Sequence, residues 1–271
     1  MSFEAARGRC ARGLCARGRN LILSIFIGLA AAGVVFRRVR RAGWHMLVRR
    51  TVSPLGGSEI AFRLVRQLLF AIFAFLGRLE VQGAENVPPS GPLLIASNHV
   101  SDADPPVIFA ALPRWAWFVG KEELFTIPLI GPVLRCFHGF PIRHTGPADY
   151  VALRRIFGLL AKGEAVVMFP EGELSETGCL QPFHRGIAMI SLRTGVPVVP
   201  AAISGTQRMV PYGRVLPRPA RGGAVVRFGK PLDLSQTCCS DHHQRLDAAT
   251  ARIHDAVAGL LKEVDRERMK A

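Results

Sequence analysis

A chain of 271 residues has enough material for one large domain, or for one domain with an appendage. Its six cysteines show no framework spacing, which argues against a disulfide scaffold and suits a reducing compartment. The net charge of +15 is uneven, because residues 1–50 hold eleven Arg and one Glu and therefore +10 of the total. For such a region beside apolar segments, the expected partner is an anionic membrane surface and not nucleic acid.

The N-terminal part of the chain divides into two predicted regions. Residues 1–20 are rich in Gly, Ala, Arg and Cys without hydrophobic periodicity, so we expect a disordered basic segment. Residues 21–36 form an uninterrupted apolar or small run, slightly short for a membrane-spanning helix. A signal peptide is the alternative, but arginines stand where its cleavage site should follow. We therefore expect a membrane-associating helical region at residues 21–78, unless Met46 is the true translation start.

A second apolar segment, Glu59 to Leu79, carries three arginines among leucines and phenylalanines. This composition predicts a helix at a membrane interface. The alternative is a core helix with an exposed basic edge. A strand is expected at Leu79 to Gly83, followed by a Pro/Gly loop over Ala84 to Gly91.

A histidine and a carboxylate follow the next strand. Pro92 to Ser97 predicts a strand buried on both faces, and Asp104 with two prolines predicts a helix start with Asp104 as N-cap. His99 then lies at a strand-to-helix turn, where open α/β sheets place ligands. There Asp104 can accept a hydrogen bond from one imidazole nitrogen, and the other nitrogen can take a proton from a hydroxyl. Two alternatives stay open: Asp104 only caps its helix, or Asp102 is the partner of His99.

Two cations follow apolar runs later in the chain. Trp115 to Val119 predicts a strand ahead of Lys121, Pro128 to Phe137 a short helix, and Gly139 to Arg143 a strand end. Lys121 and Arg143 would emerge at a sheet edge, where each could hold an anionic substrate group by charge-assisted hydrogen bonds. The alternative for either residue is a solvated surface charge.

The second half alternates helices and strands. Glu164 to Phe169 predicts a strand that leads into a polar loop with Glu171 and Gly172, and Gly172 would let backbone amides approach a ligand closely. The other expected elements are helices at Ala148 to Lys162, Phe183 to Thr194 and His243 to Lys262, and strands at Val196 to Ile203 and Ala224 to Phe228. This alternation predicts an α/β fold with a mainly parallel central sheet flanked by helices, preceded by the N-terminal membrane-associating helices. The run Cys238 to His243 lacks zinc-knuckle spacing, so we expect no metal site there.

Four motifs in order resemble the successive blocks of the lysophosphatidic acid acyltransferase family of glycerolipid acyltransferases. They are Asn98-His99-x4-Asp104, Gly120-Lys121 with Gly139 to Arg143, Phe169-Pro170-Glu171-Gly172, and Val196 to Pro200. The similarity covers about Leu79 to Phe228 and implies an acyltransferase domain at residues 79–271.

The resemblance implies transfer of a fatty acyl group from coenzyme A or acyl carrier protein to the free hydroxyl of a lysophospholipid, without a cofactor. It implies that His99 is the general base and that Asp104 orients it. Lys121 and Arg143 would receive the acceptor phosphate, while Glu171 and Gly172 belong to the third block of the substrate site. The expected location is a membrane, at the cytoplasmic face of the inner or cell membrane.

The third block departs from the family pattern of glutamate, glycine, threonine, arginine and serine. Here Glu173 and Leu174 replace the threonine and the arginine, so the usual phosphate-binding arginine is absent. Lys121, Arg143 or Arg185 could hold the phosphate instead, or the acceptor could be a zwitterionic lysophospholipid or an amino-lipid. A thioesterase or hydrolase is an alternative of another class, although no G-x-S-x-G elbow is present. A non-catalytic membrane-binding protein would leave the His, Asp and Glu-Gly residues unexplained.

Overall fold

The computed structural model describes residues 59–270, except 129–130, 132–133, 136, 144–148, 213–216 and 238–240. The predicted disordered segment at 1–20 and membrane anchor at 21–36 lie outside the described residues, and the predicted short helix at Pro128 to Phe137 lies partly outside them. Among the described helices, none combines the length and apolarity needed to cross a bilayer.

One seven-stranded sheet forms the centre of the molecule, in the order β1-β7-β6-β2-β5-β3-β4. Strands β6, β2, β5, β3 and β4 are parallel, whereas β7 runs antiparallel to β6 and parallel to β1. This arrangement confirms the prediction of a mainly parallel sheet. The strands are β1 (Leu79–Gln82), β2 (Leu93–Ser97), β3 (Trp117–Lys121), β4 (Gly139–Ile142), β5 (Ala165–Met168), β6 (Val198–Ser204) and β7 (Ala224–Phe228).

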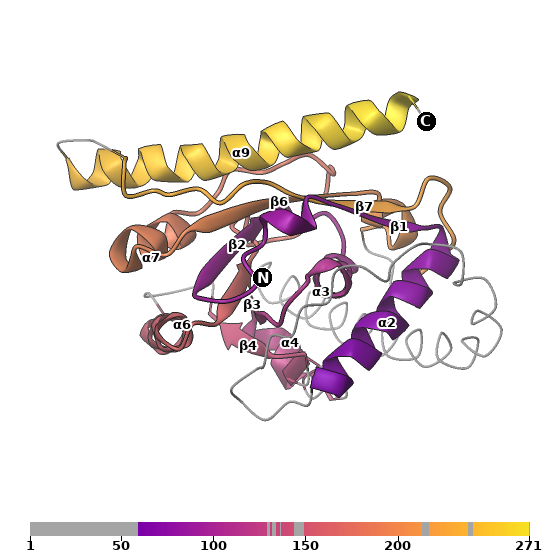
Figure 1. Cartoon of the computed structure of the whole chain (residues 1–271), viewed down its shortest axis with the longest axis horizontal. Coiled ribbons are helices and arrows are strands. Elements are labelled where there is room, and N and C mark those ends of the chain that lie inside the picture. The colour runs from indigo at the N-terminus through magenta and orange to yellow at the C-terminus, as the bar shows by residue number, and fades with distance from the viewer. Residues whose placement is uncertain are drawn as a thin grey trace, which may run out of the picture.

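Helices cover both faces of the sheet, with α2 and α3 on one side and α9 on the other (Figure 1). Helices α6 and α7 share the hydrophobic cluster of the α9 side. The described helices are α2 (Glu59–Leu76), η2 (Ala84–Asn86), α3 (Asp104–Ala111), α4 (Glu122–Thr126), α6 (Tyr150–Ala161), α7 (Gly186–Thr194), α8 (Thr206–Met209) and α9 (His242–Lys270). Flanking helices are thus confirmed as part of the fold.

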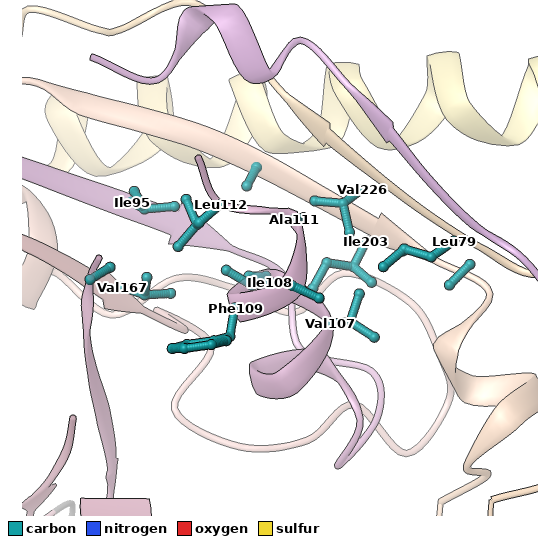
Figure 2. Close-up of a cluster of buried hydrophobic side chains, with 14 of the residues drawn as sticks. Leu79, Ile95, Val107, Ile108, Phe109, Ala111, Leu112, Val167, Ile203 and Val226 are labelled. Carbon is teal, nitrogen blue, oxygen red and sulfur yellow. The ribbon is translucent and has the colours of Figure 1, made fainter. Parts of the chain in front are cut away.

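The core beneath α3 holds the helix on the sheet. Along β2, Leu93 and Ile95 face the α3 side of the sheet, while Leu94 and Ala96 face the α9 side. Figure 2 shows Ile108 of α3 among side chains from neighbouring strands, including Ile95, Ile203 and Val226. Because fully burying a residue such as Ile108 contributes roughly 1.5–3 kcal/mol, this packing holds α3 against the sheet.

Helix α2 packs on α3 through part of its surface. Phe62, Phe73 and Leu76 are buried in the same cluster, and Arg66 donates a hydrogen bond from Nε to the Ala110 carbonyl at 3.0 Å. Burial lowers the pKa of Arg66 to about 10. The helix therefore belongs to the core layer of the domain, which was the alternative interpretation, while contact with a membrane interface stays a prediction.

The last helix extends to Lys270, eight residues beyond the predicted end at Lys262. Apolar periodicity does not identify this extension, because polar contacts hold it. Arg227 of β7 pairs with Glu263 at 3.0 Å and with Glu267 at 2.6 Å. The hydroxyl of Ser204 donates to Asp265 Oδ1 at 2.9 Å. These contacts fasten the end of α9 to β6 and β7.

Candidate active site

The predicted site residues gather at one edge of the sheet. Strands β2, β5, β3 and β4 are parallel, so their carboxyl ends meet at the same edge. His99 follows β2 and Glu171 follows β5, whereas Lys121 ends β3 and Arg143 follows β4. The fold thus places four segments that are separate in sequence along a single edge.

His99 and Asp104 are in direct contact. The imidazole Nδ1 lies 2.9 Å from Asp104 Oδ2, and the Asp104 side chain is completely buried whereas that of His99 is 18% exposed. The same carboxylate oxygen accepts hydrogen bonds from the backbone amides of Val100 at 2.7 Å and Ser101 at 2.8 Å. Asp104 therefore closes the turn that carries His99.

The predicted role of Asp104 as an N-cap is wrong. Ala103 occupies the cap position, and Asp104 is the first residue of α3. Its carboxylate binds amides that precede the helix, because the turn folds back over it. The interpretation of Asp104 as only a helix cap is thereby excluded. The other candidate partner of His99, Asp102, is exposed.

Sequence reasoning missed a fourth donor to Asp104. Thr206 is completely buried in α8 and donates from Oγ1 to Asp104 Oδ1 at 2.6 Å. It follows Gly205, whose φ of 98° is in the left-handed region that favours glycine. A threonine after a buried strand has no distinctive pattern, and it lies 102 residues from Asp104 in sequence, so no local signal identifies it.

These donors set the geometry in which the imidazole meets Asp104. The Asp104 carboxylate accepts hydrogen bonds from one hydroxyl and two backbone amides, so it acts here as an acceptor. His99 Nδ1 must then carry the proton of the shared hydrogen bond. Within the described part of the chain Nε2 has no hydrogen-bond partner, so its lone pair is available to accept a proton.

Glu171 holds the backbone of the turn that carries His99. One carboxylate oxygen accepts from the His99 amide at 2.7 Å and the other from the Gln181 amide at 2.8 Å. Burial raises the pKa of Glu171, and the two amide hydrogen bonds offset this effect only in part. Direct contact between Glu171 and a substrate stays a prediction, because the contacts seen here are with the chain itself.

The loop after β5 also contacts His99. The ring of Phe169 stacks on the imidazole with a centroid distance of 4.2 Å, and the Ser175 amide donates to the His99 carbonyl at 2.9 Å. Gly172 has a φ of 74°, and its amide donates to the Phe169 carbonyl at 3.0 Å. Gly172 therefore shapes the turn that presents Phe169, and its predicted role at a ligand remains a prediction.

Lys121 and Arg143 come from the ends of neighbouring strands, because Lys121 is opposite Ile142 in the sheet register and Arg143 follows Ile142. Lys121 Nζ lies 2.8 Å from Glu173 Oε1, and Arg143 Nε lies 3.6 Å from Glu122 Oε2. Such exposed ion pairs contribute only about 0–1 kcal/mol, so a phosphate could displace the carboxylates.

The third candidate for phosphate binding, Arg185, is engaged on another element. Its guanidinium makes two contacts with the carboxylate of Asp247 in α9. A bidentate contact between a guanidinium and a carboxylate is a strong form of ion pair. Releasing Arg185 for a phosphate would therefore cost more than releasing Lys121.

Replacing Thr206 with valine tests its hydrogen bond to Asp104. The variant keeps the shape of the side chain but leaves a buried carboxylate oxygen without its donor, so we expect a loss of about 1–3 kcal/mol in the free energy of unfolding. We also expect roughly tenfold slower turnover at unchanged KM, because about 1.4 kcal/mol of lost support for the charged imidazole corresponds to that factor. Thr206→Ser restores the donor and should restore the rate. A fully active, stable valine variant would contradict this role.

Residues 78–204 match the family model described as Acyltransferase. Over 209 residues the chain is 37% identical to the 1-acyl-sn-glycerol-3-phosphate acyltransferase BAT2, chloroplastic, of Brassica napus, covering 76% of this chain and 56% of that protein. It is 29% identical over 196 residues to the human 1-acyl-sn-glycerol-3-phosphate acyltransferase alpha, covering 69% of each. The chain thus spans little more than half of the Brassica protein.

The fold is similar to the crystal structure of the 1-acyl-sn-glycerophosphate (LPA) acyltransferase PlsC from Thermotoga maritima. The TM-score is 0.64 at 24% sequence identity, and the match covers 93% of this chain and 97% of the other. The two proteins therefore share their fold.

Proposed function

We propose that the chain belongs to the lysophosphatidic acid acyltransferase family, which its similarity to these relatives supports, and that it transfers a fatty acyl group from a thioester to the free hydroxyl of a lysophospholipid. The preferred acceptor is 1-acylglycerol-3-phosphate, which gives phosphatidic acid. The donor is acyl coenzyme A or acyl carrier protein. The reaction takes place at an anionic membrane surface, on the cytoplasmic face of the inner or cell membrane.

The observation that carries this proposal is the 2.9 Å contact between His99 Nδ1 and a buried, fully hydrogen-bonded Asp104. It supports an imidazole that Asp104 orients through Nδ1, with Nε2 facing no hydrogen-bond partner among the described residues. That combination suits a general base whose conjugate acid must be stabilised during the reaction.

The proposed reaction needs no covalent enzyme intermediate. His99 Nε2 takes the proton of the acceptor hydroxyl as its oxygen attacks the thioester carbonyl. The carbon–oxygen bond forms, the carbon–sulfur bond breaks, and the thiol leaves with the proton that His99 held. Asp104 stabilises the imidazolium while it exists, and the Glu171 carboxylate keeps the His99 backbone in place.

Lys121 and Arg143 are the proposed phosphate ligands at the neighbouring strand ends. Their position supports this role, since they emerge at the same edge of the sheet as His99. One observation favours a second acceptor class: Glu173 already neutralises Lys121, and Leu174 supplies no positive charge. A zwitterionic lysophospholipid or an amino-lipid is therefore the alternative acceptor.

An acceptor panel tests the proposal. Purified protein receives a long-chain acyl thioester with lysophosphatidate, lysophosphatidylethanolamine or lysophosphatidylcholine, and the diacyl products are identified by mass spectrometry. We expect lysophosphatidate to react fastest. Acylation of only the zwitterionic acceptors would replace it with the second class, and release of free fatty acid without any diacyl product would indicate a thioesterase.

A further inference from the structure

A side-chain amide continues the sheet contact where β2 stops. The last residue pair between β2 and β6 is Ser97 with Ala201, yet β6 runs on to Ser204. The residue after β2 is Asn98, which is 1% exposed. Its Nδ2 donates to the Ile203 carbonyl at 2.9 Å, and the Ile203 amide donates to its Oδ1 at 2.8 Å. The amide of Asn98 thus takes the place that a strand backbone would have beside Ile203.

Both polar atoms of the Asn98 side chain are used by the main chain. An asparagine amide has an acceptor oxygen and a donor nitrogen, so it matches the N–H and the carbonyl of one residue at the same time. Leucine has a similar size but would leave the backbone of Ile203 without these partners, and an unpaired buried backbone group is unfavourable. The Asn98 side chain is therefore committed to the sheet, and it acts on the site through its neighbours.

Ile203 is a fixed reference point in the core. Its side chain is 1% exposed and packs among residues of α3 and the neighbouring strands, as Figure 2 shows. On its other side β6 pairs with β7, where Ile203 is opposite Val226. Protein interiors are closely packed, so a link to Ile203 restrains the segment that it holds.

The Asn98 link is made at the start of the turn that carries His99. The backbone amides of the next residues bind carboxylates and not the sheet. His99 donates to Glu171 at 2.7 Å. Val100 donates to Asp104 at 2.7 Å. The Asn98 side chain therefore ties the turn to β6 one residue before the imidazole.

The segment that begins at Ile203 also carries the other contacts of this turn. Thr206 donates to Asp104 Oδ1 at 2.6 Å. Farther along, the Val210 carbonyl accepts from the Ser101 hydroxyl at 2.8 Å. The turn is thus bound to one continuous segment at its start, middle and end, and the amide link fixes the end that is next to the imidazole.

We propose that Asn98 is a positioning residue for His99. By holding the start of the turn to Ile203, it sets the separation of 2.9 Å at which the imidazole Nδ1 meets the Asp104 carboxylate. This inference rests on the proposed role of His99 as general base. A misplacement of about 1 Å can cost on the order of a hundredfold in rate. Loss of the Asn98 amide should therefore slow turnover more than it weakens substrate binding.

Asn98→Leu tests this role in the full-length protein, because it keeps the size of the side chain and removes both hydrogen bonds. We expect turnover about a hundredfold below wild type, with the KM for acyl thioester and for lysophosphatidate within about twofold. Rates are measured below the thermal unfolding transition of each protein.

The matched control is Asn86→Leu. Asn86 Nδ2 donates to the Phe228 carbonyl at 3.0 Å. Phe228 ends β7, which runs antiparallel to β6, so this amide lies at the opposite edge of the sheet from His99. The control loses a comparable side-chain amide, and its turnover should stay within about twofold of wild type because distant sites act independently.

NMR of nitrogen-labelled histidine tests the geometry without a substrate. The His99 signals are identified by their loss in His99→Ala. At a pH where the ring is neutral, the wild type should carry its ring proton on Nδ1, facing Asp104, and Asn98→Leu should show a mixture of both tautomers. This measurement judges the role of Asn98 even if the protein transfers no acyl group, so the two proposals can fail separately.

Several outcomes would overturn the proposal. Wild-type turnover of Asn98→Leu would show that the amide only satisfies the backbone of Ile203. A raised KM with unchanged turnover would assign Asn98 to substrate binding. Slow turnover with an unchanged tautomer would mean that Asn98 does not act through the contact between His99 and Asp104.

A second variant applies if Asn98→Leu does not fold by circular dichroism. Asn98→Ala leaves room for a water molecule, which can bond to the backbone of Ile203 but cannot hold the turn in place. Turnover should still fall by at least about tenfold, because the imidazole is no longer positioned. A fully active alanine variant would overturn the proposal.

Discussion

His99→Ala should lower the rate of acyl transfer by a factor of about 10² to 10⁴ while the protein stays folded. Removal of a positioned general base has an effect of this size. The His99 side chain is partly exposed, and its ring contact is with Phe169. Replacing it with alanine should therefore remove only a modest amount of packing. Turnover with saturating acyl thioester and acceptor measures the effect, and circular dichroism confirms the fold.

A second histidine provides the control. His254 lies in α9 and contacts Phe183 and Asp255, away from the turn that carries His99. His254→Ala should keep its activity within about twofold of wild type, since surface changes have small effects. Equal activity of His99→Ala and wild type would show that His99 is structural and would refute the proposed mechanism.

Asp104→Asn should lower turnover about a thousandfold, with little loss of stability. The asparagine oxygen can replace Oδ2 and keep the bonds from His99, Val100 and Ser101, while the hydroxyl of Thr206 turns to accept from the new amide. Geometry is thus retained and only the charge is lost. An imidazolium without its anion is poorly stabilised, which accounts for the size of the effect.

Asp104→Ala separates charge from structure. It leaves the Val100 and Ser101 amides unsatisfied in a buried position, at about 1–3 kcal/mol each, so chemical denaturation should show a clear loss of stability. Asp241→Asn is the control, because Asp241 accepts from the Gln244 amide at the start of α9 and does not contact the site. An Asp104→Asn variant with wild-type turnover would exclude a role for the charge.

The sequence supported the parts of the fold that depend on local signals. Buried strands such as β2 and β5 are short apolar runs, and the loop after each one carries a predicted site residue, His99 or Glu171. The His99–Asp104 contact was predictable because a five-residue turn brings the two side chains together.

Other features depend on tertiary contacts and have no local signal. The role of Thr206 follows from a hydroxyl that meets Asp104 only in the folded sheet. The ion pair of Lys121 with Glu173 joins two strand ends, so neither sequence segment reveals it. The last turns of α9 are polar, and their contacts with Arg227 stabilise a helix that hydrophobic periodicity cannot predict.

A single-turnover experiment tests direct transfer most closely. Excess enzyme is mixed with labelled acyl thioester, with and without lysophosphatidate, and thiol release, diacyl product and protein-bound label are followed together. We predict that thiol appears only with the acceptor, in step with the diacyl product, and that no label remains on the denatured protein. Thiol release without acceptor, or a labelled protein, would contradict a His99 base that acts on the acceptor hydroxyl.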